Sequence, residues 1–200
     1  LEDFLVLTKK KDLILLQEAI LNSPFDSHFN RSLQHQWIMA SSFKNIKTNI
    51  ETGVKTGSTV GVKQHYFSAS THSEQTTEYP LDVMNQSLLV VNSHIINFVS
   101  FEKFRTHIDQ VFQTMKDHNG PLLLAGDFNT WNSKRLKYFH DRAISFSLKE
   151  VELTRQPRLT HLFKHLDHIY YRDLKFIEAH VHTNIHSSDH YPISLSLRTV

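Results

Sequence analysis

The chain contains no cysteine among its 200 residues. Disulfide frameworks, thiolate zinc sites and cysteine nucleophiles are therefore excluded. No run of apolar residues is long enough to cross a bilayer, and we find neither a signal peptide nor an internal repeat or low-complexity linker. These absences lead us to expect a cytoplasmic protein. Because the sequence begins at Leu1 rather than at a methionine, we also expect a further segment upstream.

The chain also lacks an excess of charge of either sign. It carries 22 Lys and Arg against 20 Asp and Glu, a net charge of +2 with histidine neutral, so the global electrostatic footprint of a nucleic-acid binder is missing. One local basic cluster, Lys134, Arg135 and Lys137, could either face phosphate or lie on a solvated surface. Hydrophobic residues make up 40%, enough for the core of one domain spanning residues 1–200.

Apolar segments of two periodicities alternate along the chain. Helical spacing predicts helices over 1–8, 101–116 and 133–146, and buried or alternating runs predict strands over 12–18, 37–40, 59–62, 67–70, 76–79, 88–94, 122–125, 166–171, 175–181 and 191–197. The polar residues 44–58, which contain glycine, are interpreted as a surface connection. Many strands interleaved with few helices indicate a mixed α/β domain, with sheets packed together and helices outside.

Two strand ends carry most of the chemical information. Gly126 to Asn129 follows the apolar run 122–125, and Ser188 to His190 precedes the alternating run that contains Ile193. Loops positioned by strands carry chemistry. Asp127, Asn129, Asp189 and His190 could therefore share one cleft, and this set suits a hard metal ion and phosphate chemistry.

Three more strands end in polar side chains. Asp167 lies in an apolar strand and needs a partner, because burying an unpaired charge is costly. His190 would supply that partner and would have its tautomer fixed by the carboxylate. Glu18 and His94 each close another strand. Singly, such residues are more often structural, but five strand ends of this kind are difficult to explain by core packing.

Taken together, these segments resemble a known family. The chain presents in order Gln17-Glu18, Asn92-Ser93-His94, Gly126-Asp127-Phe128-Asn129, Leu166-Asp167-His168-Ile169 and Ser188-Asp189-His190. This order resembles the endonuclease/exonuclease/phosphatase superfamily, with the deoxyribonuclease-I-like fold. The stretches 91–98 and 120–131, with Arg135, are similar to its small bacterial branch called YafD-like. The resemblance covers roughly residues 12–198 and implies a four-layer α/β (α+β) sandwich, in which helices flank two packed mixed β-sheets.

The resemblance also implies catalytic roles. Asp127 and Asn129 would position the nucleophilic water and the reacting phosphate. His190, oriented by Asp167, would act as base or as electrophilic stabiliser. His94 is similar to the family's second active-site histidine, near the leaving group. Charge neutralisation and an aligned water are what phosphoryl transfer requires.

A divalent cation is the implied cofactor. Glu18 and Asp189 would bind Mg²⁺ or Mn²⁺. The reaction implied is hydrolysis of a phosphodiester, with nucleic acid as the first-choice substrate. Phospholipid, sphingolipid or inositol-phosphate substrates are the alternative, as is a non-catalytic binding module of the same fold. A histidine zinc site at His180, His182 and His186 is a further rival.

One departure from the family pattern concerns its first strand, which carries an active-site Asn. No residue before Asp12 matches that strand, so we expect the first strand to be missing and the domain to be N-terminally truncated. Its sheet neighbours would then expose an edge. Such edges favour pairing between chains, which leads us to expect self-association there.

Overall fold

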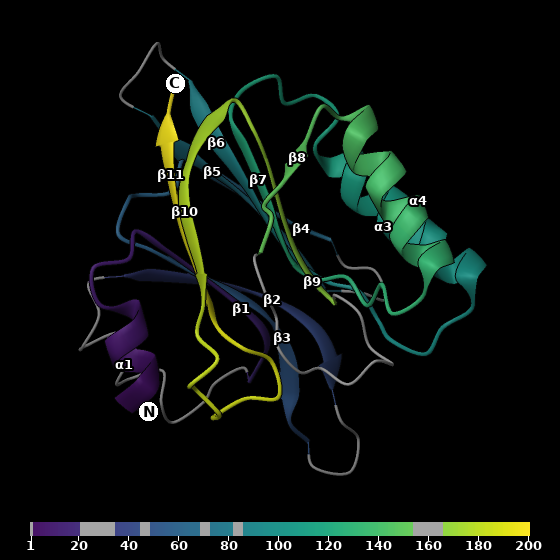
Figure 1. Ribbon diagram of the computed structural model, residues 1–200, viewed down its shortest axis with the longest axis horizontal. Coiled ribbons are helices and arrows are strands. Elements are labelled where there is room, and N and C mark those ends of the chain that lie inside the picture. Colours follow the sequence, from purple (N-terminus) through teal and green to yellow (C-terminus); the bar gives the residue numbers. More distant parts are fainter. Residues whose placement is uncertain (1, 21–34, 45–48, 69–72, 82–85, 154–165) are drawn as a thin grey trace.

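The structure, a computed structural model, describes residues 2–20, 35–44, 49–68, 73–81, 86–153 and 166–200. Its helices are α1 (Glu2–Thr8), α3 (Phe101–Thr114) and α4 (Ser133–Ser145). Its strands are β1 (Leu13–Ile20), β2 (Gln36–Lys44), β3 (Glu51–Ser58), β4 (Gln64–Ser68), β5 (Ser73–Pro80), β6 (Ser87–His94), β7 (Leu122–Asp127), β8 (Lys149–Glu150), β9 (Asp167–Arg172), β10 (Leu174–Val181) and β11 (Ile193–Thr199). A six-stranded sheet has the order β4-β5-β6-β7-β9-β8, and two smaller sheets have the orders β1-β3-β2 and β10-β11 (Figure 1).

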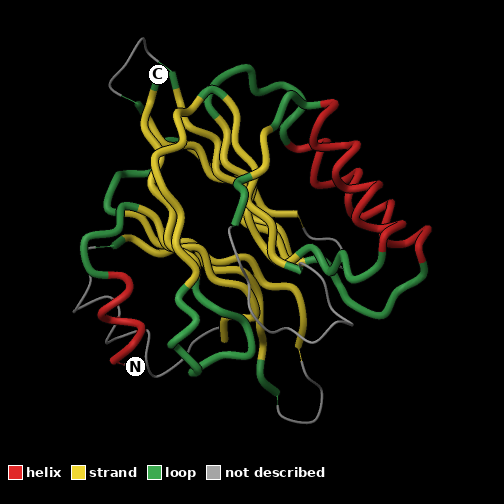
Figure 2. The backbone as a smooth tube through the Cα atoms, in the orientation of Figure 1, coloured by secondary structure: helices red, strands yellow, loops and turns green. Residues whose placement is uncertain are grey.

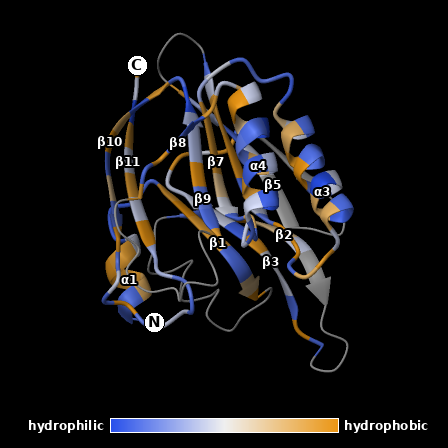
Figure 3. Cartoon of the chain, turned by 45° about the vertical axis from the view of Figure 1, so that its right-hand side comes forward, coloured by the Kyte–Doolittle hydropathy of each residue, from blue (hydrophilic) through white to orange (hydrophobic). Residues whose placement is uncertain are grey.

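Helices α3 and α4 lie side by side over one face of the six-stranded sheet (Figures 1 and 2). The spacing of Phe104, Ile108 and Val111 places all three on one side of α3, where they are fully buried. The helix begins where the Ser100 hydroxyl accepts a hydrogen bond from the Lys103 backbone N–H at 3.3 Å. Hydrophobic and hydrophilic residues alternate along both helices (Figure 3), as one-sided packing requires.

The opposite face of the six-stranded sheet packs against the smaller sheets. Tyr79, Val90 and Leu123 form a second core there, joined by partly buried side chains that include Leu15 of β1 and Leu197 of β11. Two layers of sheet with helices outside are the arrangement that the sequence predicts. Among the described residues, β1 pairs only with β3 and β11 only with β10.

The surface connection predicted over residues 44–58 is wrong for the second half of this range, and residues 45–48 lie outside the described residues. This second half forms β3, the central strand of the three-stranded sheet, and Thr56 in it is 1% exposed. Two glycines explain why such a polar strand is buried: a Cβ on Gly53 would lie 1.9 Å from the Ala40 carbonyl oxygen, and one on Gly57 would lie 2.7 Å from the Trp37 ring. The strand expected over 59–62 is instead a bend and coil.

No helix among the described residues is long and apolar enough to span a membrane.

Candidate active site

Three candidate side chains lie in one row across the six-stranded sheet. His94 at the end of β6 pairs in register with Asp127 at the end of β7, and Asp127 pairs with Asp167 at the start of β9. Residues directly opposite one another on neighbouring strands point to the same face. The sheet thus sets two carboxylates and an imidazole next to one another, with Asp127 in the middle.

His190 joins this row from the loop before β11. Its Nδ1–H donates to Oδ2 of Asp167 at 2.7 Å, as predicted from the sequence. This hydrogen bond is the main cause that raises the pKa of His190 to about 9, against the opposing effect of burial. The His190 ring is therefore an imidazolium at neutral pH.

Asp127 is the most perturbed acid of the row. Burial, followed by the charge of Asp167, raises the pKa of Asp127 to about 7. Its Oδ1 accepts the backbone N–H of Asn129 at 2.9 Å, while its Oδ2 lies 3.8 Å from Nε2 of His94 and 4.0 Å from Nε2 of His190. A carboxyl group with this pKa can exchange a proton near neutral pH.

His94 and Glu18 close the other side of the cluster. Oε1 of Glu18 lies 3.6 Å from Nε2 of His94, and burial lowers the pKa of His94. Glu18 does not end its strand as expected, because β1 continues to Ile20. It sits instead at a register shift between Leu16 and Ala19, with a φ of 51°. This irregularity turns its mostly exposed side chain toward β6.

Beneath Glu18, buried Asn92 fastens β1 to β6. Its Oδ1 accepts from Nε2 of Gln17 at 2.7 Å. Its Nδ2 faces the carbonyl oxygens of Leu16 at 3.3 Å and Lys55 at 3.2 Å. The sequence places Gln17 and Asn92 in the family motifs, but spacing alone gives no sign that they bond to each other.

The loop after β7 has a conformation that its residues make possible. Gly126 has a φ of 152°, and a Cβ there would lie 1.8 Å from the Ser93 carbonyl oxygen, so only glycine allows β6 and β7 to approach this closely. Asn129 follows with a φ of 50°. Its side-chain Nδ2 donates to the Ile95 carbonyl oxygen at 2.8 Å.

Arg135 fixes the same loop from the other side. It is 1% exposed. Its Nη1 donates to the Asn129 carbonyl oxygen at 3.1 Å and its Nη2 to that of Val99 at 2.5 Å, while its guanidinium lies over the rings of Phe104 and Trp131. The guanidinium, enclosed by carbonyl groups and aromatic rings, stabilises the loop and cannot reach the phosphate of a substrate.

The neighbouring lysines are also engaged. Nζ of Lys137 lies 2.8 Å from Oδ2 of Asp141, and that of Lys134 lies 4.1 Å from the centre of the Phe101 ring. Of the two readings of this cluster, the solvated surface therefore fits the two lysines better than a phosphate-facing patch.

Asp189 lies at the edge of the cluster. Its exposed side chain is 3.4 Å from the Ser188 hydroxyl, and its charge is one of the smaller influences that raise the pKa of His190. No contact joins Asp189 to Glu18 in the part of the chain that the structure describes. Their shared role as cation ligands stays a prediction.

The donor set nevertheless fits a hard divalent cation. Carboxylate oxygens of Asp127 and Asp167 lie within 4.8 Å of each other and of a His190 ring nitrogen, and Glu18 approaches from β1. Because His190 is an imidazolium, the carboxylates are the candidate ligands. Burial first, and then the charge of Asp167, raises the pKa of Asp127 and makes its charged form unfavourable without a cation. The gaps of 3.6–4.0 Å around His94 and Asp127 are too long for hydrogen bonds and suit a bridging water or ion. Oxygen-rich sites of this kind select magnesium-type ions.

The histidine zinc rival gains no support. The rings of His180 and His182 are 4.6 Å apart, and Nε2 of His182 lies 2.8 Å from the Ser194 hydroxyl. Among the described residues, His186 does not join them in a three-ligand group.

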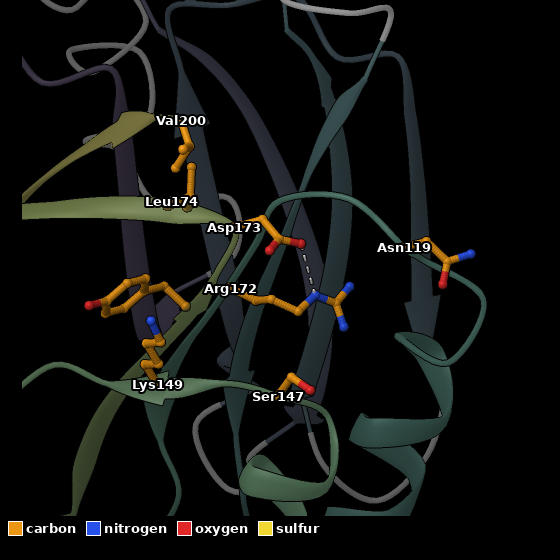
Figure 4. A pocket seen from close by; sticks show the side chains of 8 residues that line it. Asn119, Ser147, Lys149, Arg172, Asp173, Leu174 and Val200 are labelled. Carbon is orange, nitrogen blue, oxygen red and sulfur yellow. Dashed lines mark ion pairs between the residues drawn. The ribbon is translucent and has the colours of Figure 1, made fainter.

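Two hollows flank the sheet. One of about 610 Å³ lies at the far end of β9, beside Lys149, Arg172 and Asp173 (Figure 4). Nη2 of Arg172 donates to the carbonyl oxygens of His118 and Gly120, so this arginine is structural. Arg172 lies five positions after Asp167 along β9, about 17 Å away. A smaller hollow of about 380 Å³ adjoins Asp167 itself.

Comparison with known proteins agrees with this geometry. The Endonuclease/Exonuclease/phosphatase family profile matches residues 3–190. A UPF0294 protein of Vibrio vulnificus (strain YJ016) is 34% identical over 122 residues, which cover 60% of this chain and 42% of that relative. The match thus spans less than half of the relative's length.

Solved structures share the fold. The endonuclease/exonuclease/phosphatase from Beutenbergia cavernae DSM 12333 superposes with a TM-score of 0.77 at 13% identity, covering 98% of this chain and 64% of that one. D. rerio TDP2 complexed with single-strand DNA product gives a TM-score of 0.69 at 12% identity, with 98% and 89% covered. These identities speak for the fold alone, and the fold class predicted from the sequence is confirmed.

Proposed function

This chain belongs to the endonuclease/exonuclease/phosphatase family, and from that premise we propose that it hydrolyses phosphate diesters by direct attack of water, assisted by a Mg²⁺ or Mn²⁺ ion. The observation that carries the proposal is the position of Asp127. Its carboxyl group lies between His94 and His190 and has a pKa near 7. An acid with that pKa is suited to take a proton from water at neutral pH.

Asp127 acts as the base. The Asn129 N–H occupies its Oδ1, which leaves Oδ2 to face the reacting groups. As the water oxygen bonds to phosphorus, its proton passes to Oδ2 and the bond from phosphorus to the leaving oxygen breaks. The bonding electron pair leaves with that oxygen as an alkoxide, which takes a proton from solvent water, and Asp127 returns its own proton to solvent at the end of the cycle.

His190 and His94 stabilise the charges that develop. The Asp167 hydrogen bond keeps His190 cationic and fixes its ring, so that Nε2–H is directed at a non-bridging phosphate oxygen. His94 is held neutral by burial and donates a hydrogen bond to the leaving oxygen. Asn129 is 2% exposed and its Nδ2 donates to the Ile95 carbonyl oxygen, so it acts through the backbone N–H that it donates to Asp127 and not by contact with the phosphate.

Glu18 and Asp189 would hold the cation beside Asp127. When bound, it supplies positive charge that neutralises the phosphate oxygens. The fit of Glu18 rests on its position next to the cluster: its Oε1 lies 3.6 Å from Nε2 of His94, which lies 3.8 Å from Oδ2 of Asp127.

Single-stranded nucleic acid is the first-choice substrate. It is supported by D. rerio TDP2, which shares the fold and was solved with single-strand DNA product. Two observations count against nucleic acid: the net charge is only +2, and the basic residues Lys134, Arg135 and Lys137 already have partners within the protein. Phospholipid, sphingolipid and inositol phosphate are the second class of substrate.

The test is a panel of esters: single-stranded DNA and RNA, phosphatidylcholine and sphingomyelin vesicles, an inositol phosphate and bis(4-nitrophenyl) phosphate, each with Mg²⁺ and with chelator. We expect turnover of the chromogenic diester in Mg²⁺ and the highest kcat/KM on single-stranded nucleic acid. A higher kcat/KM on the lipid vesicles would replace nucleic acid with phospholipid or sphingolipid as the substrate class. Tight binding of one ester without any hydrolysis would contradict the proposal and favour a binding module.

A further inference from the structure

A second carboxylate–imidazole pair, extended by a hydroxyl, lies next to the catalytic row. Nδ1–H of His168 donates to Oε1 of Glu150 at 2.7 Å, and Nε2 of His168 lies 2.6 Å from Oγ1 of Thr130. His168 is 3% exposed and Thr130 is 1% exposed. The two ring nitrogens of His168 are thus hydrogen-bonded to a carboxylate on one side and to a hydroxyl on the other.

The alternation of β9 places this second pair back to back with the catalytic pair. Asp167 points to the side of the sheet where His190 lies. Its neighbour His168 points to the other side, where its ring packs against Phe139 and Phe128 at centroid distances of 5.3 and 6.3 Å. One short stretch of strand therefore carries two carboxylate–imidazole pairs, one on each face.

Thr130 connects the second pair to the reacting groups. It directly follows Asn129, whose φ of 50° is a conformation that non-glycine residues rarely adopt. Arg135 donates a hydrogen bond to the Asn129 carbonyl oxygen, and the next residue, Thr130, is hydrogen-bonded to His168 of β9. The loop from Asp127 to Thr130 is thus tied at both ends of its strained residue, which is typical of backbone held for function.

Glu150, His168 and Thr130 are arranged like a carboxylate–histidine–hydroxyl triad, but Thr130 is not a nucleophile. Its hydroxyl is covered, and no substrate phosphorus can approach a side chain that is 1% exposed. Packing alone would not need this arrangement either, because an apolar side chain of similar volume would fill the site of His168 without the cost of burying an imidazole. What apolar residues could not do is hold Thr130 in one orientation by a directed hydrogen bond.

We propose that Glu150, His168 and Thr130 are positioning residues that hold the Asp127–Asn129 loop in its reactive conformation. This inference rests on the proposed function of that loop. Glu150 fixes the tautomer of His168, His168 fixes the Thr130 hydroxyl, and Thr130 fixes the backbone that carries Asn129 and the N–H donated to Asp127.

The test compares two substitutions at one position. Thr130→Val removes the hydroxyl and keeps the volume, whereas Thr130→Ser keeps the hydroxyl. The first readout does not need activity: hydrogen exchange of the Asn129 amide, whose N–H donates to Asp127. We expect exchange about tenfold or more faster in Thr130→Val, at unchanged global stability, and near wild type in Thr130→Ser.

The second readout is hydrolysis of bis(4-nitrophenyl) phosphate in Mg²⁺. We expect Thr130→Val to lower kcat about 10–100-fold with KM changed less than about twofold, and Thr130→Ser to restore kcat. Glu150→Gln should act in the same direction. Glu152→Gln is the matched control, because Glu152 is an exposed carboxylate that borders the same small hollow.

The two readouts separate the inference from the proposed function. If wild type hydrolyses no ester but the exchange pattern holds, the proposed function fails and the positioning role stands. If Thr130→Val exchanges at Asn129 as slowly as wild type and keeps its kcat, the positioning role is overturned. Equal losses in Thr130→Val and Thr130→Ser would also overturn it, because the hydroxyl would then be irrelevant.

Discussion

Asp127 and Asp167 stand directly opposite each other across the antiparallel ladder of β7 and β9. The pairing forces two carboxyl groups onto one face of the sheet. One of them, Asp167, accepts a hydrogen bond from the His190 ring at 2.7 Å. The other, Asp127, is buried, and its burial, followed by the nearby charge of Asp167, raises the pKa of Asp127 to about 7.

Asp127→Asn should stabilise the protein at alkaline pH. The pKa of Asp127 rises on folding from 3.8 to about 7. Between these values the folded state keeps a proton that the unfolded state has released, so the free energy of unfolding falls as pH rises through this interval. The neutral amide avoids that loss. In chelator we expect a higher Tm than wild type at about pH 8 and little difference at about pH 4; a lower Tm at both would contradict the assignment.

Asp167→Asn should lower the pKa of His190. The Asp167 hydrogen bond is the main cause of the increase from 6.5 to about 9, and an amide still accepts the bond but without charge. In the wild type, the contribution of the His190–Asp167 pair to the free energy of unfolding is full below the unfolded-state pKa of His190, 6.5. It is lost as the pH rises through about 9. Imidazole NMR titration checks the shift. Asp189→Asn is the graded control: its effect should be smaller, and an equal or larger one would contradict the stated cause.

Glu18→Gln should weaken the binding of Mg²⁺. The side chain of Glu18 is 76% exposed and that of Glu102 on α3 is 79% exposed, so Glu102→Gln is a control matched in charge and exposure. Calorimetric titration should show at least a tenfold loss of affinity for Glu18→Gln and none for Glu102→Gln. Identical affinities in both variants would exclude Glu18 as a ligand.

Association between copies of this chain is expected at the edges of β1 and β11. Each has one edge without a strand partner among the described residues, and Leu15 in β1 and Leu197 in β11 are only partly buried. Unpaired edges with apolar neighbours recruit further strands. Sedimentation should give a mass that rises with concentration, and Ile20→Lys at the exposed end of β1 should reduce it. A monomeric mass at all concentrations would argue against association.

The sequence predicts the site better than the scaffold around it. Asp127, Asp167 and His94 could be located because each ends or begins an apolar run, and the pairing of Asp167 with His190 follows from the cost of an unpaired buried carboxylate. Such signals are local. Only a few residues on either side are needed to recognise them.

The misses are residues whose partners are distant in sequence. β3 was predicted as a surface connection because its burial depends on Gly53 and Gly57 fitting against β2. Arg135 could be read as a phosphate ligand because nothing local shows that it binds the carbonyl oxygens of Asn129 and Val99. Thr130 and His168 are 38 residues apart, and their hydrogen bond exists only in the folded sheet.

The most direct measurement of the central claim is the Mg²⁺-dependent hydrolysis of bis(4-nitrophenyl) phosphate by wild type, Asp127→Asn, His190→Gln and the control Glu102→Gln. If Asp127 is the base and His190 the cationic stabiliser, each substitution should reduce kcat about 10²–10⁴-fold, while Glu102→Gln matches wild type and all four proteins remain folded. Wild-type turnover in folded Asp127→Asn would contradict the account, because the acid at the centre of the row would then take no part in the reaction.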